Sequence, residues 1–546
     1  MKKSLLVFLA VAVSLFLFTI LIFLFQKQGK VLTSDSYLYL RLMGEIPETP
    51  PQGFPPFSGI TVREIYRALE RAKSDPKVRA LYLKISFPLM GWGKAEEIRR
   101  MVESFKKTGK KVVSFVEGAD DLGYYVATAG DKIYTFPGSF VEINGIAAQR
   151  LYYKRLFKKW GISAQIFHIG NWKTAYNSYT EDRMNRWERQ QISRIGGGIM
   201  DELKGTISKT RKISPEKIQE FMDNEGGGIG LEFKASPFFD GVLEEGVVLE
   251  REFPSLSRVT AKRYSHMRRM SLSPNRIAVV FAEGVINMGR SGNLPFSGRS
   301  IGSDTMRGLL KKLEKDKNVK AVVLRINSPG GSALASEEIE NSVRKLARKK
   351  PVVISMSSYA ASGGYYISSP ANKIIAENLT LTGSIGIIGG KISIGKALSK
   401  LGIDEDHVSF SKTAIWNSPY TEYDEHQFSV IKKRLKAFYK LFLWRVAKGR
   451  GKSLEEVDKL GQGRVYLGKE ALNLGLVDSL GGMEKAISEA SHLAGISFYT
   501  VEFYPRRKTL WERVIETFSQ WNALGRLKIF LNQGYYFLPP AFYIFK

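Results

Sequence analysis

The chain of 546 residues contains no cysteine and only five histidines. Without cysteine, disulfides, thiolate nucleophiles and cysteine-ligated metals are excluded, and the redox compartment stays open. None of the histidines follows a metal-binding spacing such as HExxH; they are His168, His266, His407, His426 and His492. A zinc hydrolase is therefore not indicated, and we expect neither a metal nor another cofactor.

Acidic residues are scarce beside basic ones, with 53 against 82 and a net charge of +29. Such a balance suits nucleic acid, an anionic lipid surface or a solvated basic exterior. The basic residues are scattered through the chain, and no nucleic-acid-binding motif accompanies them. We therefore predict no nucleic-acid partner, and anionic headgroups are the better specific hypothesis.

Charge is absent from residues 5–25, where Ser14 and Thr19 are the polar members. Twenty-one residues at 1.5 Å each are long enough to span a hydrocarbon core of about 30 Å. The alternative is a cleaved signal peptide, but residues 26–30 offer no A-x-A cleavage site. We predict an anchor over residues 1–30 that inserts into membrane lipid.

The orientation of this anchor rests on few charges. Lys2 and Lys3 lie on one side of it, and Lys27 and Lys30 lie on the other. The positive-inside rule weakly favours a cytoplasmic amino terminus. We expect a single-pass protein of the bacterial cytoplasmic membrane, with its globular part on the periplasmic or extracellular side.

The sequence of the globular part contains an internal duplication. AGDKIYTFPGSFVEINGI at 129–146 and PANKIIAENLTLTGSIGI at 370–387 share a pattern 241 residues apart, with Ile143 where Ser384 stands. DPKVRALYLKISFP at 75–88 and DKNVKAVVLRINSP at 316–329 align at the same offset. After the shared proline, Leu89-Met90 replaces Gly330-Gly331. A repeat this long indicates two similar domains, predicted at 36–255 and 273–500. The first copy has kept its apolar positions and lost a serine and a diglycine.

Residues 501–546 form a basic, aromatic tail that combines Arg506-Arg507-Lys508 with Trp511 and Trp521. Such a mixture suits a segment lying at a membrane interface. It suits a packed terminal helix equally well, and both interpretations remain open.

Within the second copy, apolar runs alternate with amphipathic stretches. Strands are predicted at 276–286, 320–327, 351–358 and 373–378, and helices at 306–316 and 335–350. This alternation predicts an α/β fold with a mostly parallel sheet covered by helices. Chemistry in such sheets sits at the carboxyl ends of strands, where NSPGGS at 327–332 and TGSIG at 382–386 fall.

These two motifs together indicate a nucleophile with an oxyanion site. The glycines of NSPGGS let the backbone turn so that successive N–H groups point at one spot. Because both motifs are missing from the first copy, we assign them to one site. A serine nucleophile needs a base, and the first copy supplies Lys173 within HIGNWKTAYNSYTED at 168–182. Burial among apolar neighbours would lower the pKa of such a lysine.

The motifs resemble signal peptide peptidase A, also called protease IV, in its long duplicated form; they are LRINSPGGSALASEEI, YAASGGYYISSPANKI, LTGSIGIIGG and HIGNWKTAYNSYTED. The resemblance covers about residues 36–500. It implies two tandem Clp-protease/crotonase-like domains, a membrane-bound serine endopeptidase and a homotetramer. It also implies that Ser384 is the nucleophile, that Lys173 is the general base, and that Gly331 with the amide of Ile385 stabilises the oxyanion. Its substrates would be signal-peptide remnants and other membrane-associated peptides.

A second lysine motif leaves the base open. In the repeat, Lys412-Thr413-Ala414 of the second copy corresponds to Lys173-Thr174-Ala175 of the first. The resemblance also implies that short, unduplicated relatives carry both dyad residues in one domain. We favour Lys173, because the duplicated form builds its site across the domain junction. Ser409 or Ser411 is expected to orient whichever lysine serves.

Two other functions are compatible with the sequence. A crotonase-like fold also supports acyl-CoA enzymes, in which paired backbone amides hold a thioester oxygen. A membrane scaffold without catalysis is the third possibility. The glycine-bracketed serine and the paired lysine motifs favour the peptidase over both.

Overall fold

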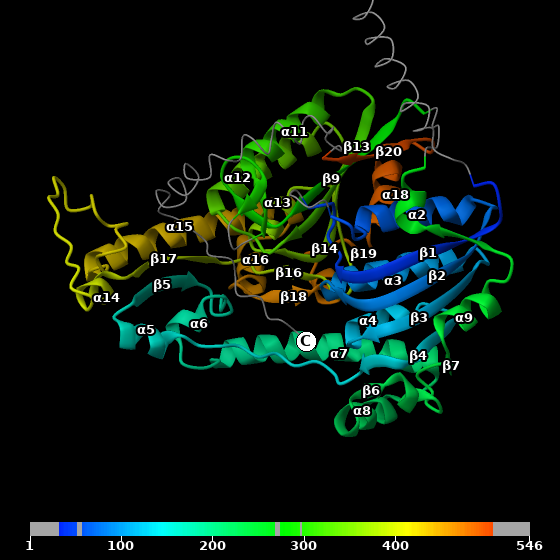
Figure 1. Cartoon of the computed structure of the whole chain (residues 1–546). Coiled ribbons are helices and arrows are strands. Elements are labelled where there is room, and N and C mark those ends of the chain that lie inside the picture. Colours follow the sequence, from blue (N-terminus) through cyan, green and yellow to red (C-terminus); the bar gives the residue numbers. More distant parts are fainter. Residues whose placement is uncertain (1–31, 52–56, 268–272, 295–297, 506–546) are drawn as a thin grey trace, which may run out of the picture.

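The computed structural model describes residues 32–51, 57–267, 273–294 and 298–505, which form two α/β units (Figure 1). The predicted anchor at 1–30 and tail residues 506–546 lie outside the described residues. Among the helices that are described, none combines the length and apolar composition needed to cross a bilayer.

The first unit is built on a seven-stranded sheet in the order β6-β4-β3-β2-β1-β8, with β7 beside β4. Its strands are parallel except for the β4–β6 pair. The strands are β1 (Ser36–Glu45), β2 (Val78–Leu89), β3 (Lys111–Ala119), β4 (Lys132–Glu142), β6 (Gly227–Ile229), β7 (Gly241–Val242) and β8 (Ser257–Thr260).

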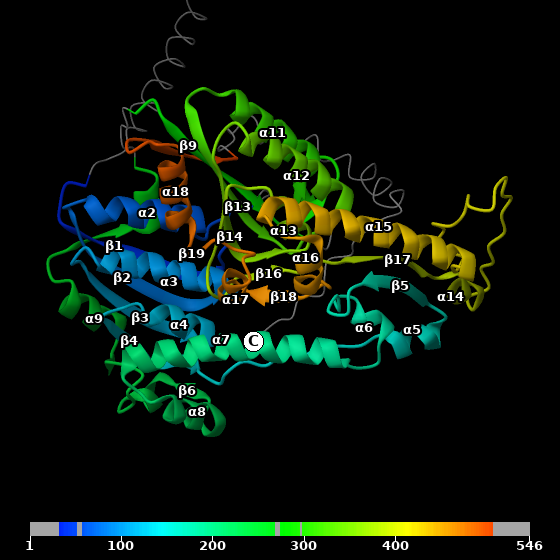
Figure 2. The same ribbon diagram turned by 180° about the vertical axis from the view of Figure 1, so that it is seen from behind.

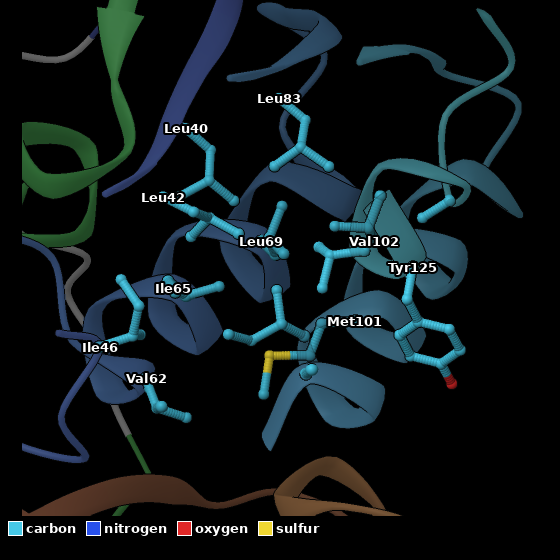
Figure 3. Close-up of a cluster of buried hydrophobic side chains, with 14 of the residues drawn as sticks. Leu40, Leu42, Ile46, Val62, Ile65, Leu69, Leu83, Met101, Val102 and Tyr125 are labelled. Atoms are coloured by element: carbon cyan, nitrogen blue, oxygen red, sulfur yellow. The ribbon is translucent and has the colours of Figure 1, made fainter. Parts of the chain in front are cut away.

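Helices cover this sheet and bury its apolar side chains. In Figure 3, Leu40, Leu42 and Leu83 of the sheet meet Leu69 and Val102 of the helices packed on it. The helices are α2 (Val62–Ser74), α3 (Trp92–Lys106), α4 (Asp121–Ala127), α7 (Arg186–Arg211), α8 (Pro215–Asn224), α9 (Glu245–Glu252) and α10 (Ala261–Ser265), with a 3-10 turn, η1, at Gly230–Phe233. Thr61 begins α2 with a reciprocal capping box to Glu64, which satisfies backbone donors at the helix start.

The second unit repeats this plan with an eight-stranded sheet in the order β18-β16-β14-β13-β9-β20, in which β15 joins β14 and β19. Its strands are β9 (Arg276–Glu283), β13 (Val319–Ser328), β14 (Val352–Ala361), β15 (Lys373–Ala376), β16 (Leu381–Gly383), β18 (Val465–Leu467), β19 (Ser479–Leu480) and β20 (Thr500–Tyr504). A small sheet beside it contains β10 (Val285–Asn287), β11 (Gly292–Leu294) and β12 (Gly298–Gly302).

The helices of the second unit follow the order of the first. They are α11 (Ser303–Lys315), α12 (Ala333–Ala347), α13 (Gly363–Ser368), α14 (Gly395–Ser399), α15 (Glu425–Arg450), α16 (Leu454–Leu460), α17 (Gly468–Asn473) and α18 (Met483–Leu493). The predicted α/β class, the mostly parallel sheet and the predicted helices and strands of this copy are confirmed, with shifts of a few residues at their ends and one exception. The single strand predicted at 276–286 is divided at Gly284 into β9 and β10, which lie in different sheets.

An arm joins the two units on one side of the molecule (Figures 1 and 2). From the first unit it takes α5 (Lys154–Trp160), β5 (Ser163–Ile169) and α6 (Asn177–Thr180), and from the second it takes β17 (Ile387–Ser393) and α14. β5 and β17 pair antiparallel, from Ile387 opposite Ile169 to Ser393 opposite Ser163. The two copies are therefore linked by one β-ribbon.

The units also meet through α3, which lies against β14. A Cβ atom added at Gly93 would come within 2.9 Å of the Ser357 carbonyl oxygen, so this close approach requires glycine. Behind it, the buried Arg325 of β13 pairs with Glu48 and Glu97 of the first unit. Ionic pairing satisfies charges that burial would otherwise make costly, and it fixes one unit against the other.

Candidate active site

The β5–β17 ribbon brings the predicted serine and lysine together at one of its ends. Ser384 precedes β17 by three positions, and Lys173 follows β5 by four. In an antiparallel pair, the start of one strand lies opposite the end of the other. The register that pairs Ile387 with Ile169 therefore carries both side chains into one place.

Lys173 contacts Ser384 directly. Its Nζ donates to the Ser384 Oγ at 2.7 Å and to the Ser384 carbonyl oxygen at 2.8 Å. A third hydrogen bond, at 2.9 Å, runs from Nζ to the Ser362 Oγ. The amine thus has a defined position against the serine hydroxyl, although the two residues lie 211 positions apart.

The ammonium form of Lys173 is disfavoured where it lies. Burial lowers the pKa of Lys173 to about 7, from an ordinary value of 10.5. Removing a charge from water raises its free energy, and no carboxylate is among the causes of the shift. Near neutral pH a large fraction of the lysine is an uncharged amine that can accept a proton.

The backbone at Ser384 is held in a left-handed conformation, with φ at 54°. Its N–H donates to the Arg464 carbonyl oxygen at 2.7 Å, and the next residue, Ile385, accepts from the Gly463 N–H. A Cβ atom added at Gly463 would lie 2.5 Å from the Lys173 Cβ. The 463–464 turn therefore holds the serine and the lysine together, and only glycine fits at its first position.

Two backbone amides are available to an oxyanion. On either side of Gly331, the Ser332 N–H donates to the Ile286 carbonyl oxygen and the Ile286 N–H donates to the Gly330 carbonyl oxygen. In the described part of the chain, the N–H groups of Gly331 and Ile385 have no hydrogen-bond acceptor. Gly331 has φ at 150°, and a Cβ atom there would meet the Ile286 oxygen at 2.1 Å. Such donors can stabilise a developing negative charge.

Ser362 was not among the residues singled out from the sequence. It also has positive φ, 54°, at the start of α13, and this turn aims its hydroxyl at Lys173. Strained backbone of this kind is frequent at functional sites. The repeat carried a usable signal, because Asp121 stands 241 residues before Ser362, so the two copies differ at this position as they do at Ser384 and at Gly330-Gly331.

The rival base and its predicted helpers lie elsewhere. Lys412, Ser409 and Ser411 are exposed on the loop between α14 and α15. There the Ser409 hydroxyl donates to the Ser411 carbonyl oxygen, and the Lys412 carbonyl accepts from the Trp416 indole. The structure does not bring these three residues to Ser384, and Ser362 occupies the position expected of a lysine-orienting serine.

A small cavity of about 90 Å³, open to solvent, lies beside the serine and the lysine. Both units line it. Apart from Lys173, Ser384, Thr174 and Gln191, its walls are apolar, aromatic or glycine, and they include Trp172, Ile195, Pro329, Leu381 and Val465. Pockets of this composition suit an apolar ligand fixed by a few polar groups.

The arrangement has the parts of an acyl-transfer site: a hydroxyl, an amine that can accept its proton, and free amide donors. Across the described ranges, no group of three or more His, Asp or Glu side chains is arranged to hold a metal ion.

Comparison with protein families and curated proteins gives several similarities. The sequence model of Peptidase family S49 matches residues 104–226 and 344–497. The chain is 31% identical over 495 residues to Protease 4 of Salmonella typhi, covering 88% of this chain and 78% of that protein. It is 29% identical over 487 residues to Serine protease SPPA, chloroplastic, of Arabidopsis thaliana, covering 87% and 71%.

Among solved structures, similarity is found to a ClpP1 mutant from Listeria monocytogenes, with a TM-score of 0.26 and 16% identity over 38% of this chain and 94% of that one. Similarity is also found to a mutant of the 1510-N membrane-bound stomatin-specific protease, with a TM-score of 0.27 and 17% identity, covering 44% of this chain and 100% of that one.

Proposed function

The chain belongs to peptidase family S49 and is a serine protease, and from this premise we propose that it hydrolyses membrane-associated peptides, cleaved signal peptides among them, through a dyad of Ser384 and Lys173. The observation that carries the proposal is the 2.7 Å hydrogen bond between Lys173 Nζ and Ser384 Oγ.

The reaction begins with proton transfer. Neutral Lys173 accepts the proton of the Ser384 hydroxyl while Oγ attacks the carbonyl carbon of the scissile peptide bond. The N–H groups of Gly331 and Ile385 stabilise the negative oxygen of the tetrahedral intermediate. The Lys173 ammonium then protonates the leaving amine, and the C–N bond breaks to leave an ester on Ser384.

Hydrolysis of the ester uses the same groups. Lys173, again neutral, takes a proton from water while the water oxygen attacks the ester carbonyl. Collapse of the second tetrahedral intermediate breaks the bond to Ser384 Oγ, and the proton returns to the serine. Ser362 keeps the lysine amine aimed at Oγ throughout.

The apolar walls around the dyad support an apolar substrate. Trp172, Ile195, Leu381 and Val465 would contact side chains next to the scissile bond, and the apolar cores of signal peptides offer such side chains.

The membrane setting belongs to the same proposal. We expect residues 5–25 to anchor the chain in the bacterial cytoplasmic membrane as a single pass, with the two units on the periplasmic or extracellular side. The units are expected to be of the Clp-protease/crotonase type and to assemble as a homotetramer.

The test is peptide hydrolysis by the full chain and by Ser384→Ala. A synthetic signal peptide is compared with a peptide of equal length whose apolar core is replaced by serine. The proposal predicts cleavage of the first peptide in preference to the second, and none by Ser384→Ala. Undiminished hydrolysis by Ser384→Ala would overturn the dyad, and equal cleavage of both peptides would overturn the substrate class.

A further inference from the structure

A second cavity, of about 350 Å³, lies where the two units meet and shares no lining residue with the cavity beside Lys173 and Ser384. Helices α3 and α7 of the first unit line it, together with Asn378 of the second unit, which stands between β15 and β16. Its volume falls in the range of cavities that bind small molecules. In contrast to the catalytic cavity, its walls are mainly polar and charged.

The charges on the α3 side of this cavity are balanced within the protein. Arg99 pairs with Glu103 at 3.0 Å. Arg100 pairs with Glu96 at 3.2 Å and with Glu377 at 2.7 Å. Because each of these cations has a carboxylate partner, this side of the cavity needs no ligand to balance its charge.

The charges on the α7 side have no such partners. Within the described residues, Asp201, Glu202 and Lys209 line the cavity and form no ion pair. Glu202 and Lys209 are separated by about two turns of helix, so they lie on one face of α7, roughly 10 Å apart along its axis. One wall of the cavity therefore carries a carboxylate at one end and an ammonium group at the other.

Gly205 lies between these two charges in the interior of α7. Glycine is less favourable than alanine inside a helix. A Cβ atom added at Gly205 would have no heavy atom within 4 Å beyond its own stretch of helix, so packing does not require glycine there. Its effect is to leave the helix backbone bare and to make room inside the cavity.

Tyr125 of α4 brings a buried hydroxyl to the same cavity. Its side chain is fully buried, and within the described residues its hydroxyl has no hydrogen-bond partner. In Figure 3 this hydroxyl points away from the apolar cluster that contains Leu83 and Val102. Because buried tyrosine hydroxyls are normally hydrogen-bonded, a polar ligand would complete this one.

We propose that this cavity binds a short peptide with free ends, about three residues long, with its ammonium group at Glu202 and its carboxylate at Lys209. An extended peptide advances about 3.4 Å per residue, so this length matches the separation of the two charges. The peptide backbone would lie along the bare helix at Gly205 and hydrogen-bond the Tyr125 hydroxyl. Short peptides are products of a peptidase, so the inference rests on the serine protease activity of the chain but not on the proposed dyad.

The two charges also decide between classes of ligand. A polyamine would be attracted to Glu202 and repelled by Lys209, and a phosphate would meet the reverse. A single amino acid carries both of its charges on one carbon and does not span the distance between these side chains. A peptide with two free ends satisfies both charges at once.

A bound peptide would strengthen the junction between the units. In the cavity wall, Glu96 of the first unit accepts a hydrogen bond at 2.6 Å from the Asn378 side chain of the second, and Asn378 leads through β16 to Ser384. Helix α7 reaches both cavities, with Ile195 in one and Glu202 in the other. A ligand that binds the folded, joined units stabilises them, so saturating peptide should raise the unfolding temperature.

The test is calorimetric titration of the full-length Ser384→Ala chain with trialanine, whose integrity is checked by chromatography afterwards. Acetylating the amino end or amidating the carboxyl end of the peptide should each weaken binding by about tenfold or more. In Glu202→Gln, acetylation should make little further difference, and in Lys209→Met the same should hold for amidation. Blocked peptides that bind as tightly as free trialanine would overturn the assignment of the two ends.

A second pair of variants locates the binding. Gly205→Leu fills the cavity and should abolish trialanine binding. Gly197→Leu is the matched control, because Gly197 lies in the same helix, also has open space around it and does not line the cavity; it should bind trialanine normally. Equal binding by the two variants would place the peptide elsewhere and overturn the proposal.

This proposal and the proposed dyad fail in different ways. If the unaltered chain hydrolyses the synthetic signal peptide and Ser384→Ala neither hydrolyses it nor binds trialanine, the peptide site is wrong and the dyad stands. If Ser384→Ala binds trialanine as described and hydrolyses the signal peptide undiminished, the dyad is wrong and the peptide site stands.

Discussion

The carboxyl-end edges of the two sheets differ in a few residues although their backbones follow one plan. The second edge has Gly330-Gly331, Ser362 and Ser384; the first has Leu89-Met90, Asp121 and Ile143 at the same places. Strands, covering helices and their order are retained in both. Apolar periodicity specifies the fold, and a few polar and glycine positions specify the chemistry.

The lysine motif breaks this simple division. The first copy has lost its serine, yet it supplies the amine that contacts the serine of the second copy. The first copy therefore helps to enclose the site and supplies its proposed base, whereas the second copy supplies the proposed nucleophile. The following predictions test how complete that division is.

The largest difference is expected between the two lysine motifs. Lys173→Met should lower kcat/KM by about 10⁴-fold, because the serine loses its base, while Lys412→Met should leave hydrolysis by the assembled protein unchanged. Since methionine places no charge in the buried site, Lys173→Met should also unfold at a higher temperature at pH 7. Equal losses in the two variants would remove the distinction between the copies.

A smaller loss is expected at the diglycine. Gly331→Ala places a Cβ atom 2.1 Å from the Ile286 oxygen and displaces the Gly331 N–H, so kcat should fall by about 100-fold or more. Gly289→Ala is the matched control, because Gly289 also has positive φ but open space around it. A similar loss in the control would point to general backbone strain.

The pH dependence follows from the pKa of about 7 for Lys173. The uncharged amine is the active form, so kcat/KM should fall about tenfold for each pH unit below 7 and level off above it. The free energy of unfolding should also increase as the pH rises. The unfolded lysine binds its proton more tightly, so the destabilisation is greatest below pH 7 and disappears as the pH approaches 10.5. A profile falling with rising pH would contradict a neutral-lysine base.

The smallest effect is expected for Ser362→Ala. The lysine keeps its hydrogen bonds to Ser384 and loses one that orients it, so kcat should fall by roughly tenfold with KM unchanged. Ser362→Thr, which restores a hydroxyl, should recover part of the rate. A change in KM alone would assign Ser362 to substrate binding.

Much of this organisation could be predicted from the sequence. The duplication, the alternation of strands and helices, and Ser384 as a candidate follow from local patterns, whereas the choice of Lys173 over Lys412 as its partner depended on the family resemblance. The β5–β17 ribbon could not be predicted in this way, because its strands lie more than 200 residues apart and their pairing depends on how the units meet.

Ser362 and Lys412 show two further ways in which sequence patterns do not determine the site: the first residue was missed, and the second was a candidate that does not reach the serine. Ser362 acquires its role from a positive-φ turn that brings it to a lysine of the other unit, which no periodicity reveals. Lys412 has the right motif, but the loop that carries it is exposed within one chain. A motif identifies a candidate, and the packing of the units decides which candidate reaches the serine.

The most direct test of the composite site is the labelling of Ser384 by a fluorophosphonate probe, located by mass spectrometry and followed with time. The account predicts an adduct on Ser384 that forms at equal rates in the unaltered chain and in Lys412→Met, and at a rate reduced to background in Lys173→Met. Undiminished labelling of Ser384 in Lys173→Met, or labelling at another residue, would contradict it.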